Sequence, residues 1–392
     1  MASNTKNRHD DTVLTHAGRK PFENKGIVNP PVYHASTILF PTLEVYNNPA
    51  AHTDVFYGRR GTPTTFAFAD AVTELERAHG TVLTSCGLSA VTTAVLSVTE
   101  AGSHVLMTDS VYGPSRNFMS KFLSRFGVEV EYYDPTIGSE ISSLIRDTTK
   151  VIFMEAPGSW TFEMQDIPAI ITKAKKHNIV TIVDNTWAGG YFFKPLEHGA
   201  DMSVQAATKY IVGHSDALMG TIACNEATYK KVDEAAYLLG NNVGPDDVYL
   251  AARGMRSMGT RLRQHQENGI KVANWLKSRP EVKQVLHPAL PEDPGHEIWK
   301  RDFTGASGLF GFIMEQPSTN ALANMMDHMD YFGMGFSWGG FESLLIPVDP
   351  RPIRTATNWE VEGQTMRIHI GLEDVDDLIA DLEAGFERLK QA

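Results

Sequence analysis

Short apolar runs alternate with segments of helical period between about residue 61 and residue 256. The runs end in polar or turn residues, which is typical of buried strands. We predict strands at HVLMTD (104–109), VIFMEAP (151–157), VTIVDNT (180–186), SVQAA (203–207) and LMGTIAC (218–224). Strands that alternate with helices form βαβ units, so the pattern predicts an α/β domain with a mostly parallel central sheet and helices on both faces.

Acidic residues stand at the carboxyl ends of several predicted strands. Asp109, Glu155 and Asp184 each end a strand, and a polar segment follows Ala207 at the end of another. Open α/β sheets bind ligands beyond the carboxyl ends of their parallel strands. We therefore expect these residues to converge on one crevice.

The pattern differs on both sides of this region. Residues 1–60 contain prolines and scattered aromatic residues without a sustained helical period, so this segment buries little against itself. We predict an amino-terminal arm there, with a neighbouring subunit as one candidate for what it packs on. Residues 257–392 read as a polar helix (261–278), separated strands (307–314 and 365–372) and an amphipathic helix (374–389). The prediction is an arm (1–60), an α/β domain (61–256) and a smaller α+β domain (257–392).

Composition and charge narrow the possible functions. The 392 residues are 42% hydrophobic and 21% charged, a balance typical of globular proteins rather than disordered or fibrous ones. The formal net charge is −12 and basic residues form no run, which argues against binding to nucleic acid or to an anionic membrane. Cys86 and Cys224 lie far apart, which suits a reducing cytosol better than a disulfide framework.

Membrane, secretory and metal-binding signals of the usual kinds are missing from the sequence. The most apolar long stretch, 91–107, is interrupted by Glu100, Gly102 and His104, and a membrane span needs about 20 predominantly apolar residues. The amino terminus is polar, unlike the apolar segment of a secretory signal. Histidines and cysteines lack spacings such as H-E-x-x-H and C-x-x-C. We expect a cytoplasmic protein without a metal.

Three features of the α/β region point to one kind of chemistry when they are taken together. Asp184 ends a strand, Lys209 lies in AATKYIVGHSD, and the turn CGLS (86–89) precedes a helical stretch. Taken singly, they are most often a helix cap, a solvated charge and a small-residue cap. Pyridoxal 5′-phosphate (PLP) needs an amine for its aldehyde, an acid for its ring nitrogen and a helix N-terminus for its phosphate. The three features together fit this cofactor.

Other side chains near these features have plainer interpretations. Tyr112 follows the strand that ends at Asp109, and it either lays its ring against the cofactor or packs in the core. Cys86 has no base identifiable beside it, so we interpret it as a small buried residue. His214, in GHSD, is interpreted as a loop histidine that bonds to the backbone.

Longer motifs carry a resemblance to a known family. The stretches VDNTWAGG, QAATKYIVGHSDALMG, RLRQHQE, RDFTGASGLF, GFSWGGFESL and MRIHIGLEDVDDLIADLEAGF together resemble the Cys/Met-metabolism family of PLP-dependent enzymes. The likeness covers nearly the whole chain beyond the first ten residues. It implies the PLP-dependent transferase-like fold type I and a homotetramer built from dimers with shared active sites.

The resemblance assigns cofactor roles to particular residues. Lys209 is expected to bond to PLP, Asp184 to pair with its ring nitrogen and Tyr112 to stack on its ring, and these three are also the expected catalytic residues. Tyr57 and Arg59 are expected to reach the phosphate in an adjacent subunit. The full set of expected cofactor-binding residues is Tyr57, Arg59, Gly87, Leu88, Tyr112, Asp184, Thr208 and Lys209.

The resemblance also implies how an amino-acid substrate is held. Arg367 is expected to fork onto the substrate α-carboxylate, which a planar guanidinium suits well. Ser337 is expected to hold that carboxylate or the lysine. Arg60 either meets the substrate's distal carboxylate or is a surface arginine. The expected substrate-binding residues are Arg367, Ser337, Trp338, Arg60 and Tyr57.

Two positions depart from the family pattern. Many relatives have a serine where this chain has Ala206, so one phosphate hydroxyl is missing. An acidic residue follows the stacking tyrosine by five positions in the enteric β-lyases, and Asn117 stands there in this chain. The second departure bears on recognition of the substrate's distal amino group.

The resemblance implies PLP-dependent β-elimination that cleaves a carbon–sulfur bond of L-cystathionine to homocysteine, pyruvate and ammonia, a step toward methionine. A γ-acting relative, such as a cystathionine γ-synthase or γ-lyase, would use the same cofactor residues. Two further alternatives are a β-lyase with broad use of cysteine S-conjugates and a PLP-binding regulatory protein that has lost useful catalysis. In each enzymatic case the partner is a small amino acid rather than nucleic acid or a membrane.

Overall fold

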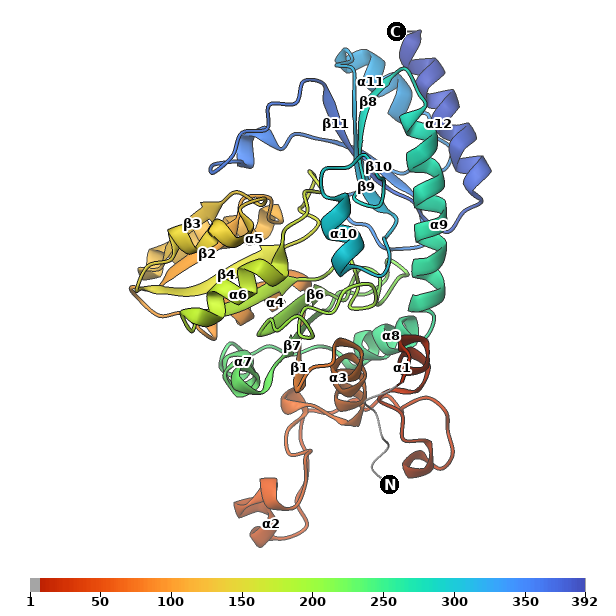
Figure 1. Ribbon diagram of the computed structural model, residues 1–392. Helices are drawn as coiled ribbons and strands as arrows, with labels where there is room; N and C mark the ends of the chain where they lie inside the picture. Colours follow the sequence, from red (N-terminus) through yellow and green to blue (C-terminus); the bar gives the residue numbers. More distant parts are fainter. Residues whose placement is uncertain (1–7, 392) are drawn as a thin grey trace.

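A seven-stranded sheet forms the centre of the structure, a computed structural model that describes residues 8–391 (Figure 1). Its strands, in the order β1-β7-β6-β5-β4-β2-β3, are β1 (Gly80–Thr84), β2 (His104–Thr108), β3 (Glu129–Tyr133), β4 (Thr149–Glu155), β5 (Val180–Asp184), β6 (Met202–Ala206) and β7 (Gly220–Cys224). The strands from β3 to β6 pair in parallel, whereas β7 runs antiparallel to β6 and β1. The prediction of a mostly parallel sheet is therefore confirmed.

The five predicted strands are β2, β4, β5, β6 and β7, and the two strands at the edges of the sheet were not predicted. β3 has the sequence EVEYY, in which two glutamates interrupt the apolar run. Its first residue is exposed and the next three are partly exposed. β1 has the sequence GTVLT, which contains only two large apolar residues. Edge strands tolerate such polar residues because one side lacks a neighbouring strand.

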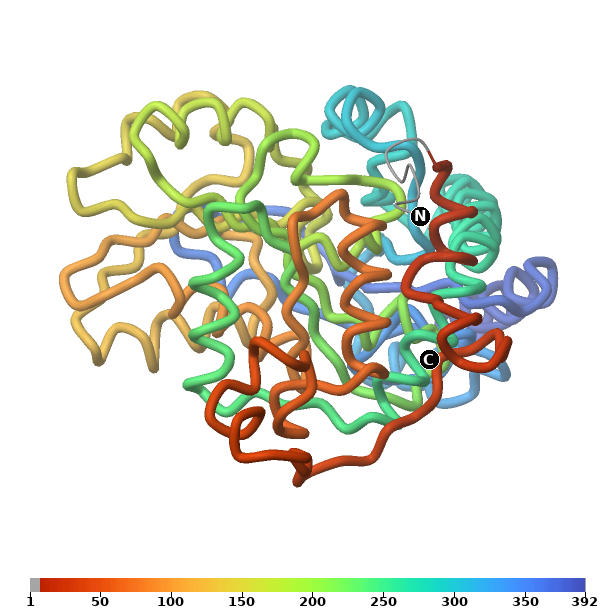
Figure 2. The backbone as a smooth tube through the Cα atoms, turned by 90° about the horizontal axis from the view of Figure 1, so that it is seen from below, coloured from red at the N-terminus to blue at the C-terminus, as the bar shows by residue number. Residues whose placement is uncertain are grey.

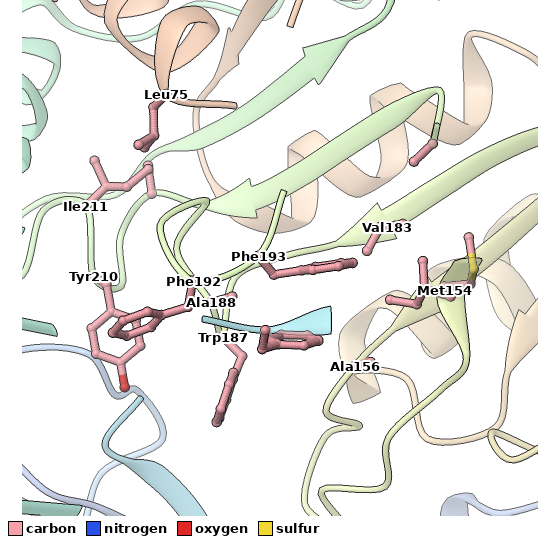
Figure 3. Close-up of a cluster of buried hydrophobic side chains, with 14 of the residues drawn as sticks. Leu75, Met154, Ala156, Val183, Trp187, Ala188, Phe192, Phe193, Tyr210 and Ile211 are labelled. Atoms are coloured by element: carbon pink, nitrogen blue, oxygen red, sulfur yellow. The ribbon is translucent and has the colours of Figure 1, made fainter. Parts of the chain in front are cut away.

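Helices cover both faces of this sheet (Figure 1 and Figure 2). One hydrophobic cluster includes α1 (Asp10–His16), α3 (Pro63–Glu76), α6 (Ile167–Lys176) and α8 (Pro245–Met255), and the other includes α4 (Gly87–Leu96) and α7 (Glu226–Leu238). Successive strand residues point to opposite faces. Accordingly, Leu106 packs in the first cluster and Val105 in the second. Figure 3 shows part of the first cluster, with Met154 and Val183 of the sheet and Leu75 of α3.

The carboxy-terminal part contains a second, antiparallel sheet. Its strands, in the order β10-β11-β9-β8, are β8 (Val282–Leu286), β9 (Leu309–Met314), β10 (Leu344–Val348) and β11 (Gln364–His369). The accompanying helices are α9 (Met258–Lys277), α10 (His296–Asp302), α11 (Thr319–Met326) and α12 (Val375–Lys390). Residues of α9, α11 and α12 pack with the sheet in a third cluster. The predicted segments 307–314, 365–372 and 374–389 thus correspond to β9, β11 and α12.

α9 contributes to two hydrophobic cores. Met258 and Leu262, near its start, pack in the cluster against the large sheet, whereas Val272 and Leu276, near its end, pack against the second sheet. Figure 1 shows this helix running alongside both parts. The predicted boundary at residue 256 therefore falls just before a helix that joins the two parts.

Residues 8–60 divide into a packed and an exposed segment. Val13 and Leu14 of α1 are buried, and α1 contacts α3 and α9 of the same chain. The segment predicted as an arm (1–60) therefore contains a part, residues 10–17, that packs on its own chain, because its apolar residues stand at helical spacing. Beyond them, Phe22 and Leu39 are 97% and 87% exposed, and α2 (Leu43–Asn47) projects from the body (Figure 1).

Within residues 8–391, no helix combines the length and the apolar character needed to cross a membrane. The first seven residues of the polar amino terminus, on which the expectation of no secretory signal partly rests, lie outside the described part of the chain.

Candidate active site

A cavity of about 250 Å³ opens at the carboxyl ends of β4, β5 and β6, beside the start of α4 and the carboxy-terminal sheet. The cavity joins residues that lie far apart in the sequence, from Cys86 to Arg367. The expected site residues on its walls are Gly87, Leu88, Tyr112, Asp184, Thr208, Lys209, Trp338 and Arg367. Glu155, another strand-ending acid, also lines it.

Lys209 lies in the loop after β6 and directs its amine toward the carboxy-terminal part. Nζ donates to Ser337 Oγ at 2.7 Å and lies 5.3 Å from the centre of the Trp338 ring. Burial and the nearby charge of Arg367 lower the pKa of Lys209 to about 8, against the opposing effect of Asp184. An amine with this pKa is partly neutral at physiological pH, so it can act as a nucleophile or a base.

Two partly buried carboxyl groups lie on neighbouring strands at the cavity. Asp184 of β5 lies opposite Glu155 of β4 in the parallel pairing of these strands. The Asp184 carboxylate accepts hydrogen bonds from the Thr186 N–H at 3.0 Å and the Thr186 hydroxyl at 2.6 Å. Burial raises the pKa of Asp184, but the Thr186 bonds and the charge of Lys209 oppose this. Burial and the charge of Asp184 raise the pKa of Glu155 well above its usual value. The pKa of Glu155 is therefore raised further than that of Asp184, and Asp184 is the first of the two to ionise.

Tyr112 stands immediately before α5 (Gly113–Asn117), at the rim of the cavity. Its N–H donates to Glu155 Oε2 at 2.8 Å, which ties the start of the helix to the end of β4. Burial and the charges of Asp184 and Glu155 raise the pKa of the phenol, so the hydroxyl stays protonated at neutral pH. The residue is 46% exposed, which leaves the ring free to cover a bound molecule.

The start of α4 provides donors for an anion. Cys86 is the N-cap, and its Sγ accepts the Ser89 N–H at 3.4 Å. The first N–H groups of a helix lack intrahelical acceptors and carry the positive end of the helix dipole. A Cβ on Gly87 would lie 2.4 Å from Ala206 Cβ. Glycine and alanine at these positions therefore let the turn approach the end of β6 closely, which accounts for the small side chain at residue 206.

Arg367 extends from β11 into the cavity wall. Its guanidinium donates to the carbonyl oxygens of Gly335 at 2.9 Å, Ser337 at 3.0 Å and Phe336 at 3.2 Å. Burial lowers the pKa of Arg367 to about 10, so the group remains cationic at neutral pH. A buried cation on the wall of the same cavity as the Lys209 amine is suited to binding a carboxylate.

Asp109 does not reach the cavity, so the expectation that all the strand-ending acids converge was wrong for this residue. Its carboxylate accepts bonds from the N–H groups of Thr355 at 3.1 Å, Ala356 at 3.1 Å and Thr357 at 2.9 Å, and from Arg116 at 3.0 Å. Residues 355–357 belong to the connection between β10 and β11, which thus covers the end of β2. A buried carboxylate needs such donors, and we call this arrangement the Asp109 clamp.

The arm residues singled out from the sequence lie outside this chain's cavity. The guanidinium groups of Arg59 and Arg60 lie 4.3 Å and 4.2 Å from the centre of the Tyr237 ring in α7, and Arg59 also donates to the Tyr237 carbonyl at 2.9 Å. Tyr57 is half-exposed, and Asn117 is exposed on α5 without lining the cavity. Their expected roles in binding cofactor or substrate stay predictions.

Sequence reasoning missed the apolar wall of the cavity, which includes Trp160, Phe162, Trp187 and Leu218. Trp160 and Phe162 have φ values of 67° and 57°, which are uncommon for bulky residues and recur at functional sites. Trp187 stands three positions after Asp184, and this closeness was the available signal. The other three come from loops that no local pattern connects to the site.

The structure shows the surroundings of His214 and Cys86, which were interpreted as a loop histidine and a small buried residue. His214 Nδ1 bonds to the Val212 carbonyl at 2.6 Å, which confirms a loop histidine held by the backbone. Cys86 is only partly buried and lines the cavity, because its thiol caps α4.

Comparisons with known proteins identify the family of this chain. The family model described as "Cys/Met metabolism PLP-dependent enzyme" matches residues 11–387. The chain belongs to this family. The cystathionine beta-lyase MetC of Escherichia coli (strain K12) is 47% identical over 388 residues, which are 97% of this chain and 98% of that protein. The L-alanine/L-glutamate racemase of Wolbachia pipientis wMel is 42% identical over 394 residues, with 97% of both chains covered. The solved structure of metB from Corynebacterium glutamicum has a TM-score of 0.91 at 29% identity, and the match covers 98% of this chain and 100% of that one.

These matches confirm the predicted family and fold, and they imply PLP as the cofactor. The residues of the cavity fit this group on their own chemistry. Lys209 offers a partly neutral amine and Asp184 an ionising acid on the walls of the same cavity. Gly87 has no side chain to cover the first N–H groups of α4, where a phosphate would bind.

Proposed function

We propose that this chain is a cystathionine β-lyase, which cleaves a carbon–sulfur bond of L-cystathionine and releases homocysteine, pyruvate and ammonia in methionine biosynthesis. The observation that carries the proposal is the Lys209 amine, with a pKa of about 8, in one cavity with Asp184 and Arg367. The identity with a relative named as a cystathionine β-lyase, over nearly all of both chains, supports this choice of substrate.

PLP, when bound, accepts the electron pair that is released as bonds at the substrate Cα break. Lys209 would hold its aldehyde, Asp184 would keep its ring nitrogen protonated, and Tyr112 would cover one face of its ring. The phosphate is assigned to Gly87, Leu88 and the hydroxyl of Thr208. The N–H groups at the start of α4 and the small residues around them support this assignment.

Arg367 and the loop beside it are assigned to the substrate. The guanidinium would bind the α-carboxylate, because it is a cation at the cavity wall next to Lys209. Ser337 would orient the Lys209 amine through the bond seen between them. Trp338 would limit the space around that amine, and Arg60 of a neighbouring copy is assigned to the distal carboxylate.

The chain's own residues move the protons of the reaction. The neutral Lys209 amine takes the proton from the substrate Cα. Sulfur leaves Cβ with the electron pair of the broken bond, and it takes a proton from the Lys209 ammonium or from the Tyr112 phenol. Water then hydrolyses the remaining three-carbon fragment to pyruvate and ammonia, so no oxidant or reductant is needed.

Turnover of L-cystathionine by the holoenzyme tests this function. We expect equal amounts of pyruvate and homocysteine, and we expect Lys209→Ala to lose both this turnover and the visible absorbance of lysine-bound PLP. Formation of 2-oxobutyrate with cysteine would refute β-elimination and favour a γ-acting enzyme. Bound PLP without turnover of cystathionine or any cysteine S-conjugate would favour a regulatory protein.

A second copy of this chain is assigned to complete each cavity, in a homotetramer built from dimers. The exposed arm and the position of Tyr57 and Arg59 outside their own cavity support this. Mixing Arg59→Ala with Lys209→Ala subunits should restore activity, because a hybrid dimer then contains one site with both residues. A mixture no more active than either variant would refute shared sites.

Racemisation is a second candidate function, favoured by the 42% identity with a named amino-acid racemase. It would need the same proton removal at Cα and a proton return on the opposite face. Chiral analysis of the holoenzyme incubated with L-alanine or L-glutamate decides this. D-Alanine or D-glutamate formed faster than pyruvate from cystathionine would make racemisation the principal activity.

A further inference from the structure

Two side chains of β11 hold the loop of residues 335–340. Arg367 and His369 lie on the same side of the strand, because alternate strand residues share a face. Arg367 bonds to the carbonyl oxygens of residues 335–337. His369 Nε2 lies 3.1 Å from the Gly339 nitrogen and 3.2 Å from the Gly340 carbonyl oxygen. The first half of the loop is therefore held by a cation and the second half by an imidazole.

This loop lies directly against Lys209. Ser337 accepts the bond from Nζ, and the Trp338 ring lies 5.3 Å from the same atom. Gly339 has a φ of 84°, and a Cβ there would lie 3.0 Å from the Cα of Lys209. The backbone of Gly339 thus packs on the backbone of Lys209, so displacement of the loop would displace the lysine as well.

On a neutral His369 ring, Nε2 either accepts the Gly339 N–H or donates to the Gly340 carbonyl oxygen, but not both, and the neighbouring His265 is neutral as well. His265, on α9, is fully buried, and its Nδ1 lies 2.8 Å from the Ile370 carbonyl oxygen. A carbonyl oxygen only accepts, so this Nδ1 carries a proton. Burial lowers the pKa of His265 to about 4, which leaves the ring neutral and its Nε2 bare.

The buried N–H of Gly339 selects the tautomer of His369. No other acceptor bonds to this N–H among the described residues, so a proton on Nε2 would leave it facing another donor. A buried N–H without an acceptor is rarer in native structures than a carbonyl oxygen without a donor, which favours a proton on Nδ1 over one on Nε2. His369 Nε2 is then bare and accepts the Gly339 N–H.

We propose that His369 is a positioning residue for Lys209, which acts by accepting the Gly339 N–H and so fixing the loop that packs on the lysine. The proposal rests on the function proposed above for Lys209. Burial, with His265, Arg367 and Lys209 nearby, lowers the pKa of His369 well below its usual value, so the ring keeps its acceptor at working pH. Tyr210, whose ring centre is 6.0 Å away, completes its surroundings.

Three variants of the full-length holoenzyme test this role. His369→Leu removes the acceptor, and His369→Gln restores one at about the position of Nε2. His287→Leu is the matched control, because His287 is also fully buried and accepts one backbone N–H, that of Ala289 at 3.1 Å, away from the cavity. The readouts are amide hydrogen exchange of residues 335–340, visible circular dichroism of the bound cofactor, thermal unfolding, and kcat/KM.

We expect faster exchange in the 335–340 loop, altered dichroism and a kcat/KM lower by about 10- to 100-fold in His369→Leu. His369→Gln should recover most of each, and His287→Leu should lower only the unfolding temperature. Should His369→Leu fail to fold, His369→Asn replaces it, since its shorter side chain leaves the Gly339 N–H without an acceptor. A leucine or asparagine variant that matches the His287 control, or a glutamine variant that recovers nothing, overturns the proposal. Exchange and dichroism need no turnover, so these results stay separate from failure to cleave cystathionine.

Discussion

Replacing Asp109 with asparagine removes the charge of the Asp109 clamp at nearly constant size. In the native structure, Oδ1 accepts from Arg116 and from the Thr355 N–H, and Oδ2 accepts from the N–H groups of Ala356 and Thr357. Whichever oxygen becomes the amide NH₂, at least two of these donors then face another donor. Arg116 also loses its carboxylate, although only 9% of its side chain is exposed.

The expected loss is set by the buried charge that is left behind. Removing one partner of a buried ion pair destabilises a fold by about 3–5 kcal/mol, because the other charge cannot return to water. We therefore expect the free energy of unfolding to fall by about 3–5 kcal/mol in Asp109→Asn. Asp349→Asn is the control, since Asp349 and Arg351 form a pair at 2.7 Å whose side chains are 46% and 65% exposed. Such exposed pairs contribute about 0–1 kcal/mol.

Urea unfolding of the two variants, followed by tryptophan fluorescence at constant PLP, measures the difference at neutral pH. The pH dependence gives a second check. Burial alone would raise the pKa of Asp109, but the bonds from Thr355 and Thr357 and the charge of Arg116 hold it below its ordinary value. A carboxyl with a depressed folded pKa stabilises the fold above its unfolded pKa, about 3.9, and loses this as pH falls through the folded pKa. A loss below about 1 kcal/mol, or a gap that widens in acid, would refute the reasoning.

Three further predictions concern the site and the core. The pKa of Glu155 is raised by burial and by Asp184, so the carboxyl ionises at a lower pH in the unfolded chain than in the folded one. The free energy of unfolding should therefore fall as pH rises from the unfolded pKa toward the folded pKa. Glu155→Gln should flatten that part of the pH profile in urea unfolding, and an unchanged profile would contradict this. Ser337→Ala removes the acceptor 2.7 Å from the Lys209 amine, so kcat/KM should fall about tenfold without a change in unfolding temperature, and unaltered kinetics would argue against the bond. Phe193 stacks on Phe303 at 4.4 Å between ring centres, so Phe193→Ala should cost about 3–5 kcal/mol in urea unfolding, and a loss near zero would mean that the cavity collapses.

The sequence located the reactive residues that stand at strand ends near the middle of the sheet. Asp184 and Glu155 could be found because they end long apolar runs, and Lys209 because it follows another. Asp109 also follows an apolar run, but it does not line the cavity. Its strand β2 is separated from β5 by β4, and the backbone N–H groups that bind its carboxylate are 246 to 248 positions away. Strand ends indicate the edge of a sheet, but not which distant loop covers each end.

The remaining parts of the site depend on contacts that local patterns do not encode. Arg367 and His369 are two residues apart in a strand, which indicates a shared face, but only the fold places the 335–340 loop upon it. The role proposed for Tyr57 and Arg59 depends on a second chain, and no periodicity within one chain carries that information.

α9 restricts how substrate can enter the cavity. Because Leu262 and Val272 of this one helix are anchored in different cores, a swing of the carboxy-terminal part against the large sheet would draw apolar side chains into water, at about 1.5–3 kcal/mol each. The Asp109 clamp opposes the same motion from another side. We therefore expect a ligand to enter through movements of the rim, where Tyr112 is half-exposed, rather than through a rigid-body closure of the carboxy-terminal part on the large sheet.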